Sequence, residues 1–130
     1  MNGLFSLIQY CPDPSRGEAG NVGLVLLCPD QGYLGVRVVE DHQRIAAFFG
    51  LDAVGVDDLQ FAERSLVERI ERSRESLMNL EALAQFARTR VNDLRMTPLT
   101  SVAVGDPEQE FEGLFGELVG TGESFLSRPI

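Results

Sequence analysis

The sequence has 130 residues, 44% of them hydrophobic, which is enough for a single domain to build a core without a metal or a disulfide. Eleven arginines, no lysine and twenty acidic residues give a net charge of -9, which disfavours binding to the phosphate backbone of nucleic acids. The apolar stretches are too short to span a membrane and the N-terminus has no basic leader, so we expect a cytoplasmic protein with no membrane contact.

The first third of the chain predicts three strands. Residues 4–10 are rich in strand formers, and the prolines that follow end this segment because proline cannot donate to a sheet. Residues 22–28 are apolar on both faces, as in a central strand, and a turn at 29–32 leads into residues 33–39. The second and third segments are therefore predicted to form a β-hairpin.

Helical spacing dominates the middle of the chain. Asp41 is expected to cap a short helix that carries its apolar residues three and four positions apart. A longer amphipathic helix is predicted to begin near Asp57 or Asp58 and to keep one apolar side as far as Ala87. Its pattern indicates a break near Asn79.

The last third of the chain predicts one more strand and a helix. The strand falls across residues 93–97 or 101–104, and Asp106, Pro107 and Gln109 have the residue types of a capped helix start with a capping box. Acidic residues gather here, which indicates a solvated helix face or, as the alternative, a docking surface for a basic partner. They are Asp106, Glu108, Glu110, Glu112, Glu117 and Glu123.

These elements together predict an α+β fold. Its antiparallel sheet contains the hairpin, the N-terminal strand and a fourth strand if one of the two later segments joins it, and amphipathic helices pack on the sheet. Residues 1–120 are expected to form one domain, and residues 121–130 a loosely held C-terminal tail.

Few residue types are available for chemistry. His42 is the only histidine, and its place in the first turn of a helix favours an exposed or capping role. Cys11 and Cys28 lack Cys-x-x-Cys spacing, so the sequence indicates no metal site and no redox pair. Glu63 and the other glutamates of the long helix alternate with its arginines, so their charges largely cancel. No common catalytic motif and no particular cofactor is indicated.

One polar run, residues 12–23, stands out between two apolar strands. Asp13, Arg16, Glu18 and Asn21 bring two carboxylates, a guanidinium and an amide onto one loop. Such groups bind an anion, hold a divalent ion through oxygen atoms or move a proton. The same groups also satisfy one another, with Arg16 paired to Glu18, Asp13 in a turn and Asn21 on loop backbone. The sequence leaves both interpretations open.

The motifs of this run resemble the signature of a bacterial family, the domain of unknown function 3037. Pro-Asp-Pro at 12–14, Arg-Gly-Glu at 16–18 and Asn-Val-Gly at 21–23 carry the resemblance, which is close over residues 5–37 and looser further along. The chain departs from the pattern after Pro98, where many members have Arg-Ser-Thr and a later histidine. The resemblance implies no activity, but it implies a protein partner, because these genes often lie beside those of HipA-like kinases.

We therefore predict a small, non-catalytic binding or regulatory accessory module that uses the loop 12–23 as its recognition surface. The alternative is a metal- or carboxylate-dependent hydrolase acting on a phosphorylated or nucleotide-like substrate, with Glu18 as base or ligand and Arg16 holding an anion. That alternative needs a second carboxylate, for which Glu40 and Asp41 are candidates. A third hypothesis is a purely structural subunit of an oligomer.

Overall fold

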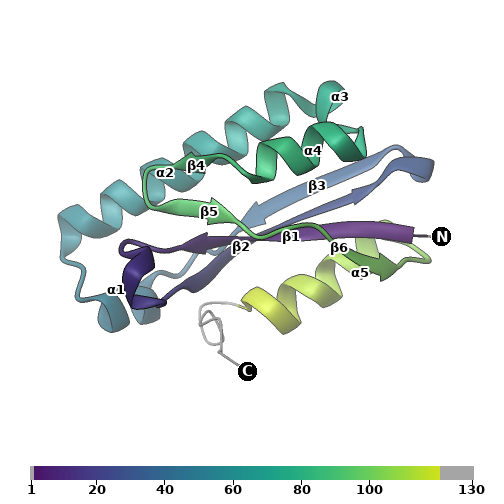
Figure 1. Ribbon diagram of the computed structural model, residues 1–130. Helices are drawn as coiled ribbons and strands as arrows, with labels where there is room; N and C mark the ends of the chain where they lie inside the picture. Colours follow the sequence, from purple (N-terminus) through teal and green to yellow (C-terminus); the bar gives the residue numbers. More distant parts are fainter. Residues whose placement is uncertain (1, 121–130) are drawn as a thin grey trace.

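A six-stranded antiparallel sheet lies at the centre of the structure, a computed structural model that describes residues 2–120 (Figure 1). Its strand order is β3-β2-β1-β5-β4, and β6 also pairs with β1. The strands are β1 (Asn2–Tyr10), β2 (Gly20–Cys28), β3 (Tyr33–Val38), β4 (Arg90–Val91), β5 (Leu94–Met96) and β6 (Thr100–Ala103). The predicted α+β fold is confirmed, whereas the tail predicted at 121–130 lies outside the described residues.

Strand β1 is paired along both of its edges. Its residues 4–10 pair with β2, and on the other edge residues 2–5 pair with β6 and residues 8–10 with β5. Between β5 and β6, Leu7 N donates to Thr97 Oγ1 and Thr97 N donates to the Leu7 carbonyl, both at 2.9 Å. Both segments that the sequence offers as a fourth strand therefore join the sheet.

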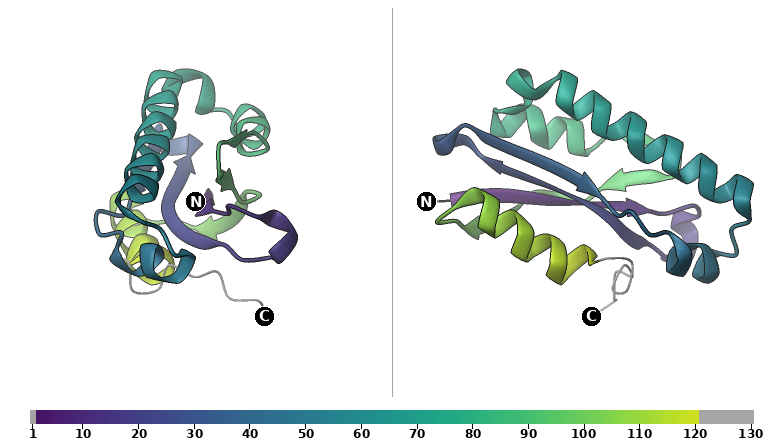
Figure 2. Two further views of the ribbon diagram at one scale, coloured as in Figure 1. Left: turned by 90° about the vertical axis from the view of Figure 1, so that its left-hand side faces the viewer. Right: turned by 180° about the vertical axis from the view of Figure 1, so that it is seen from behind.

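Helices cover both faces of this sheet. Figure 2 shows the helices at residues 53–72 and 80–87 on one face and the C-terminal helix on the other. Every residue of β2 is buried, as predicted for a central strand. The helices are α1 (Gln43–Phe49), α2 (Ala53–Arg72), α3 (Arg74–Leu77), α4 (Leu80–Ala87) and α5 (Pro107–Leu114), followed by a π-helical turn, η3 (Phe115–Val119). Within residues 2–120, no helix is both long enough and apolar enough to cross a membrane.

Helix α2 begins and ends earlier than the sequence predicts. Asp52 accepts a hydrogen bond from the first turn at 2.8 Å, and this cap moves the start of the helix from Asp57 to Ala53. The helix ends at Arg72. Asn79 then caps α4 by accepting hydrogen bonds from two backbone N–H groups. The break predicted near Asn79 is thus the start of a separate helix.

Helix α5 is attached to the sheet through Arg37 of β3. The guanidinium donates to both carboxylate oxygens of Glu112, at 3.0 and 2.5 Å, and lies about 5 Å from the ring centroids of Phe111 and Phe115. This contact lowers the pKa of the Glu112 carboxyl. Glu112, one of the acidic residues that gather in the last third of the chain, therefore helps to hold α5 against the sheet. The predicted capping box is wrong, because the Asp106 side chain makes no capping hydrogen bond.

We predict opposite effects of adding a methyl group at two glycines. A Cβ at Gly23 in β2 would lie 2.8 Å from the backbone oxygen of Arg37, so Gly23→Ala should lower the free energy of unfolding by about 1–3 kcal/mol. A Cβ at Gly113 in α5 meets open space, and Gly113→Ala should raise it by up to about 1 kcal/mol. Urea denaturation measures both, and a Gly23→Ala variant as stable as the original chain would contradict the tight approach of β2 and β3.

Candidate functional site

The polar loop is ordered by its own side chains. Asp13 Oδ1 accepts hydrogen bonds from Ser15 N at 3.1 Å and Ser15 Oγ at 2.6 Å, which begins a single 3-10 turn, η1 (Pro14–Arg16). The Ser15 hydroxyl is the main reason why the pKa of Asp13 is lowered. Gly17 ends the turn with a φ of 70°, a conformation that glycine adopts without strain. The Asx turn predicted at Asp13 is present.

Three of the four predicted residues line one cavity. Arg16 Nε lies 3.2 Å from Glu18 Oε1, with the two side chains 67% and 40% exposed. Together with Asp13 and Pro12 they face two aromatic residues of α1 across a volume of about 260 Å³. We call this cavity the loop cleft; its lining is Pro12, Asp13, Arg16, Glu18, Phe48 and Phe49.

The two acidic residues that the hydrolase hypothesis adds lie elsewhere. Neither Glu40 nor Asp41 is among the described residues that line the loop cleft. Asp41 Oδ1 instead accepts a hydrogen bond from Gln43 N at 2.9 Å, at the start of α1, which agrees with the capping role expected for it. The second carboxylate of the cleft is that of Asp13.

Asn21 does not reach the loop cleft. It is buried in β2, where its Oδ1 accepts a hydrogen bond from Gln9 Nε2 at 2.8 Å and its Nδ2 donates to the Leu118 carbonyl at 3.0 Å. A β-bulge between Ile8 and Gln9 shifts the register so that Gln9 and Asn21 become direct partners. The loop therefore contributes three exposed polar residues to one place and a buried amide to another.

The hydrogen bonds of Asn21 continue across the sheet. Gln9 is the register partner of Arg95 in β5, and Arg95 Nε donates to Gln9 Oε1 at 3.0 Å. Three hydrogen bonds follow one another in the same direction: Arg95 donates to Gln9, Gln9 donates to Asn21, and Asn21 donates to the Leu118 carbonyl. We call Arg95, Gln9 and Asn21 the amide row. It satisfies both buried amides, as a sheet interior requires.

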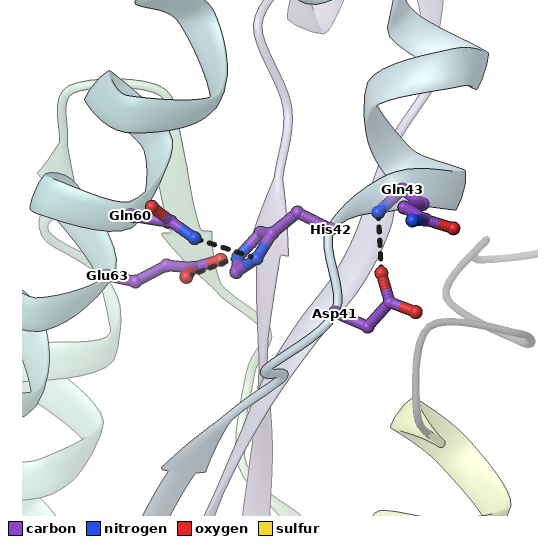
Figure 3. Close-up of polar contacts among 5 residues, drawn as sticks. All are labelled: Asp41, His42, Gln43, Gln60 and Glu63. Carbon is purple, nitrogen blue, oxygen red and sulfur yellow. Dashed lines mark hydrogen bonds and ion pairs between the residues drawn. The ribbon is translucent and has the colours of Figure 1, made fainter. Parts of the chain in front are cut away.

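A buried acid–base pair joins the start of α1 to α2 (Figure 3). His42 Nε2 lies 2.7 Å from Glu63 Oε1, and the side chains are only 6% and 2% exposed. Gln60 Nε2 lies 3.4 Å from His42 Nδ1. The second carboxylate oxygen, Glu63 Oε2, is buried and makes no hydrogen bond within the described residues.

His42 and Glu63 both have raised pKa values in the folded protein, for different reasons. The hydrogen bond to Glu63 is the main cause that raises the pKa of His42, and burial, which disfavours the charged carboxylate, raises the pKa of Glu63. Both shifts have the same sense, so the pair loses its shared proton at a higher pH than an isolated histidine does.

We predict that stability falls as pH rises because of this pair. Folding raises the pKa of His42 above its ordinary value of 6.5, so the folded state binds more protons than the unfolded state above that pH. The free energy of unfolding should fall between pH 6.5 and 8, by at most about 1.4 kcal/mol per pH unit. Glu63→Gln should flatten this slope.

Urea denaturation at several pH values tests this prediction. The range stops at pH 8 so that Cys28 and Tyr10, whose pKa values burial raises from ordinary values of 9.0 and 10.0, do not contribute. Parallel stability profiles for the original chain and Glu63→Gln over this range would contradict the pairing.

The pairing of His42 with Glu63 is not predicted from the sequence. The exposed role expected for His42 is wrong: the residue occupies the N-cap position of α1, but its imidazole makes no capping bond and is buried. Glu63 is buried as well, although the sequence presents it only as one of the charges that cancel along the long helix. It lies four residues after Leu59 and seven before Ile70, on the apolar stripe itself, and a carboxylate at such a position is the signal that indicates a buried partner.

Comparisons with known proteins identify a family and nothing finer. The sequence profile of the family described as "Protein of unknown function (DUF3037)" matches residues 5–119, which is most of the chain. No curated protein and no solved structure matches. Within the described residues, no three or more His, Cys, Asp and Glu side chains gather where they could hold a metal ion.

Proposed function

The chain belongs to the DUF3037 family, and we propose that it is a binding module that recognises a basic segment of a protein partner through the loop cleft. The observation that carries this proposal is the composition of the cleft. Arginine and aromatic side chains, phenylalanine included, are enriched in protein–protein interfaces relative to the rest of the protein surface. The loop cleft presents Arg16 together with Phe48, a residue that is 47% exposed.

The charges of the cleft indicate the kind of partner. Asp13 and Glu18 supply two carboxylates against the single positive charge of Arg16, so the lining is negative overall. The whole chain adds a net charge of -9, which attracts a positively charged partner from a distance. A lysine or arginine of the partner can approach a carboxylate while its aliphatic stem lies on Phe48.

The size of the cleft favours a side chain over a whole small molecule. Pockets that enclose a small ligand have volumes of about 300–1,000 Å³, and the loop cleft holds about 260 Å³. The neighbouring surface is formed by the ordered η1 turn, so little conformational freedom is lost when a partner binds. Because the resemblance of the sequence to this family implies a HipA-like kinase as partner, such a kinase is the first candidate to test.

The hydrolase remains the second candidate because two carboxylates, Asp13 and Glu18, line the same cleft as Arg16. It predicts turnover of a phosphorylated substrate that Glu18→Gln abolishes. The binding module predicts instead that partner binding depends on the cleft and that no turnover accompanies it.

We predict that Phe48→Ala weakens partner binding at least tenfold, about 1.4 kcal/mol, because it removes the more exposed of the two aromatic rings that line the loop cleft. Partners captured from cell extract are identified, and each is re-measured with purified components by calorimetry. Glu18→Gln should also weaken binding. The matched control is Phe61→Ala, which removes a ring from an α2 residue that is 64% exposed and lies outside this cleft.

The control must bind as the original chain does. Partner affinity unchanged in both Phe48→Ala and Glu18→Gln, with each variant folded by circular dichroism, would rule out the loop cleft as the recognition surface. An equal loss in Phe61→Ala would show that exposed aromatic surface in general, and not the cleft, holds the partner.

A further inference from the structure

We propose that a second cavity, at the end of α4, binds a small organic phosphate. This arginine pocket has a volume of about 560 Å³ and lies between the end of α4, the β4–β5 hairpin and the segment that follows β5. Three of the eleven arginines of the chain line it, namely Arg88, Arg90 and Arg95. None of the described residues in its lining is acidic.

The register of the sheet forces two of these arginines together. Arg90 of β4 and Arg95 of β5 are direct partners, so their side chains leave the hairpin on the same face. Like charges directly opposite each other destabilise an antiparallel pair. The chain has a large excess of carboxylates, yet it places none of the described ones in this lining. A bound anion would offset the repulsion between the two guanidinium groups.

Neutral acceptors hold these two side chains in place without cancelling their charge. Arg95 Nε donates to Gln9 Oε1 at 3.0 Å, and Arg90 Nη2 donates to the Cys11 carbonyl. Gln9 is itself fixed by Asn21 through the amide row. The bond from Nε leaves the two terminal nitrogens of Arg95 to bind a ligand. The buried amides therefore orient a charged group that lines the pocket, which is how binding sites are kept rigid.

Arg88 completes the positive lining. It follows the last turn of α4, and its exposed side chain has no hydrogen bond or ion pair with residues 2–120. A cation at the end of a helix is also stabilised by the helix dipole. That effect does not account for Arg90 and Arg95, which belong to strands. One carboxylate, Asp93, lies near them, 4.0 Å from Arg90 and half-exposed.

The chemistry of the lining selects the ligand. A phosphate monoester carries a charge of about -1.5 to -2 at neutral pH, and its oxygens match the paired donors of a guanidinium. The rest of the lining is mainly apolar and includes Met96 and Leu99, which suits an aromatic or aliphatic body attached to the phosphate. The volume falls within the usual range for small-molecule sites.

Titration calorimetry with phenyl phosphate tests the proposal. We expect saturable binding that is at least tenfold tighter than the binding of inorganic phosphate, because the apolar lining holds the ring. Arg88→Gln should weaken it at least tenfold without loss of folding, since this side chain supports no other described residue. Arg95→Gln should weaken it as well. The matched control is Arg72→Gln, which removes the same charge from an exposed position of α2 outside the pocket.

Four results would overturn the proposal. The first two are that phenyl phosphate shows no saturable binding, or that it binds Arg88→Gln as tightly as it binds the original chain. The other two are that inorganic phosphate binds as tightly as phenyl phosphate, or that benzoate binds more tightly than phenyl phosphate, which would assign the pocket to a carboxylate. Phe48→Ala should leave phenyl phosphate binding unchanged, because Phe48 lines the loop cleft and not this pocket. The two proposals can therefore fail separately.

Discussion

Strand β1 pairs along both of its edges, and this pairing determines how the polar residues around it must be arranged. A strand flanked on both sides and covered by helices buries its side chains, and each buried polar group must then find a partner inside the protein. Ser6 donates to the Thr97 carbonyl at 2.6 Å, in the gap where β5 gives way to β6. The buried side chain of Gln9 finds its hydrogen-bond partners on the two neighbouring strands, Asn21 on β2 and Arg95 on β5, and so links β1 to both.

The amide row follows from this requirement and links the candidate sites. The bulge after Ile8 aligns Gln9 with Asn21, and Gln9 in turn holds Arg95 at the arginine pocket. The β4–β5 hairpin also holds the end of β1. Cys11 N donates to the Asp93 carbonyl at 2.8 Å, and the Cys11 carbonyl accepts a hydrogen bond from Arg90. The loop cleft begins at the next residue. The two cavities are therefore built on one strand end, and the rigidity of each depends on it.

The strands and the fold class follow from the sequence because they depend on local patterns. Residues 22–28 are apolar on both faces, and only a central strand buries both. The pairing of Glu63 with His42 depends instead on how two helices meet, 21 positions apart in the chain, and the sequence shows only a carboxylate on an apolar stripe. The sequence predicts Asn21 to lie with its loop neighbours for the same reason, since one residue of register decides whether its side chain enters the sheet or the loop. The start of α2 depends on the single capping bond of Asp52.

The environment of the Arg95 Nε–H group tests most directly whether the buried amide row holds the sheet and its edge together. Two-dimensional proton–nitrogen spectra resolve arginine Nε–H signals, and Arg95→Lys assigns the one in question. We expect a distinct, slowly exchanging signal that becomes fast-exchanging in Gln9→Leu, while the signal of the exposed Arg72 does not change. A signal that exchanges as fast as that of Arg72 in the original chain, or that Gln9→Leu leaves unaltered, would contradict it.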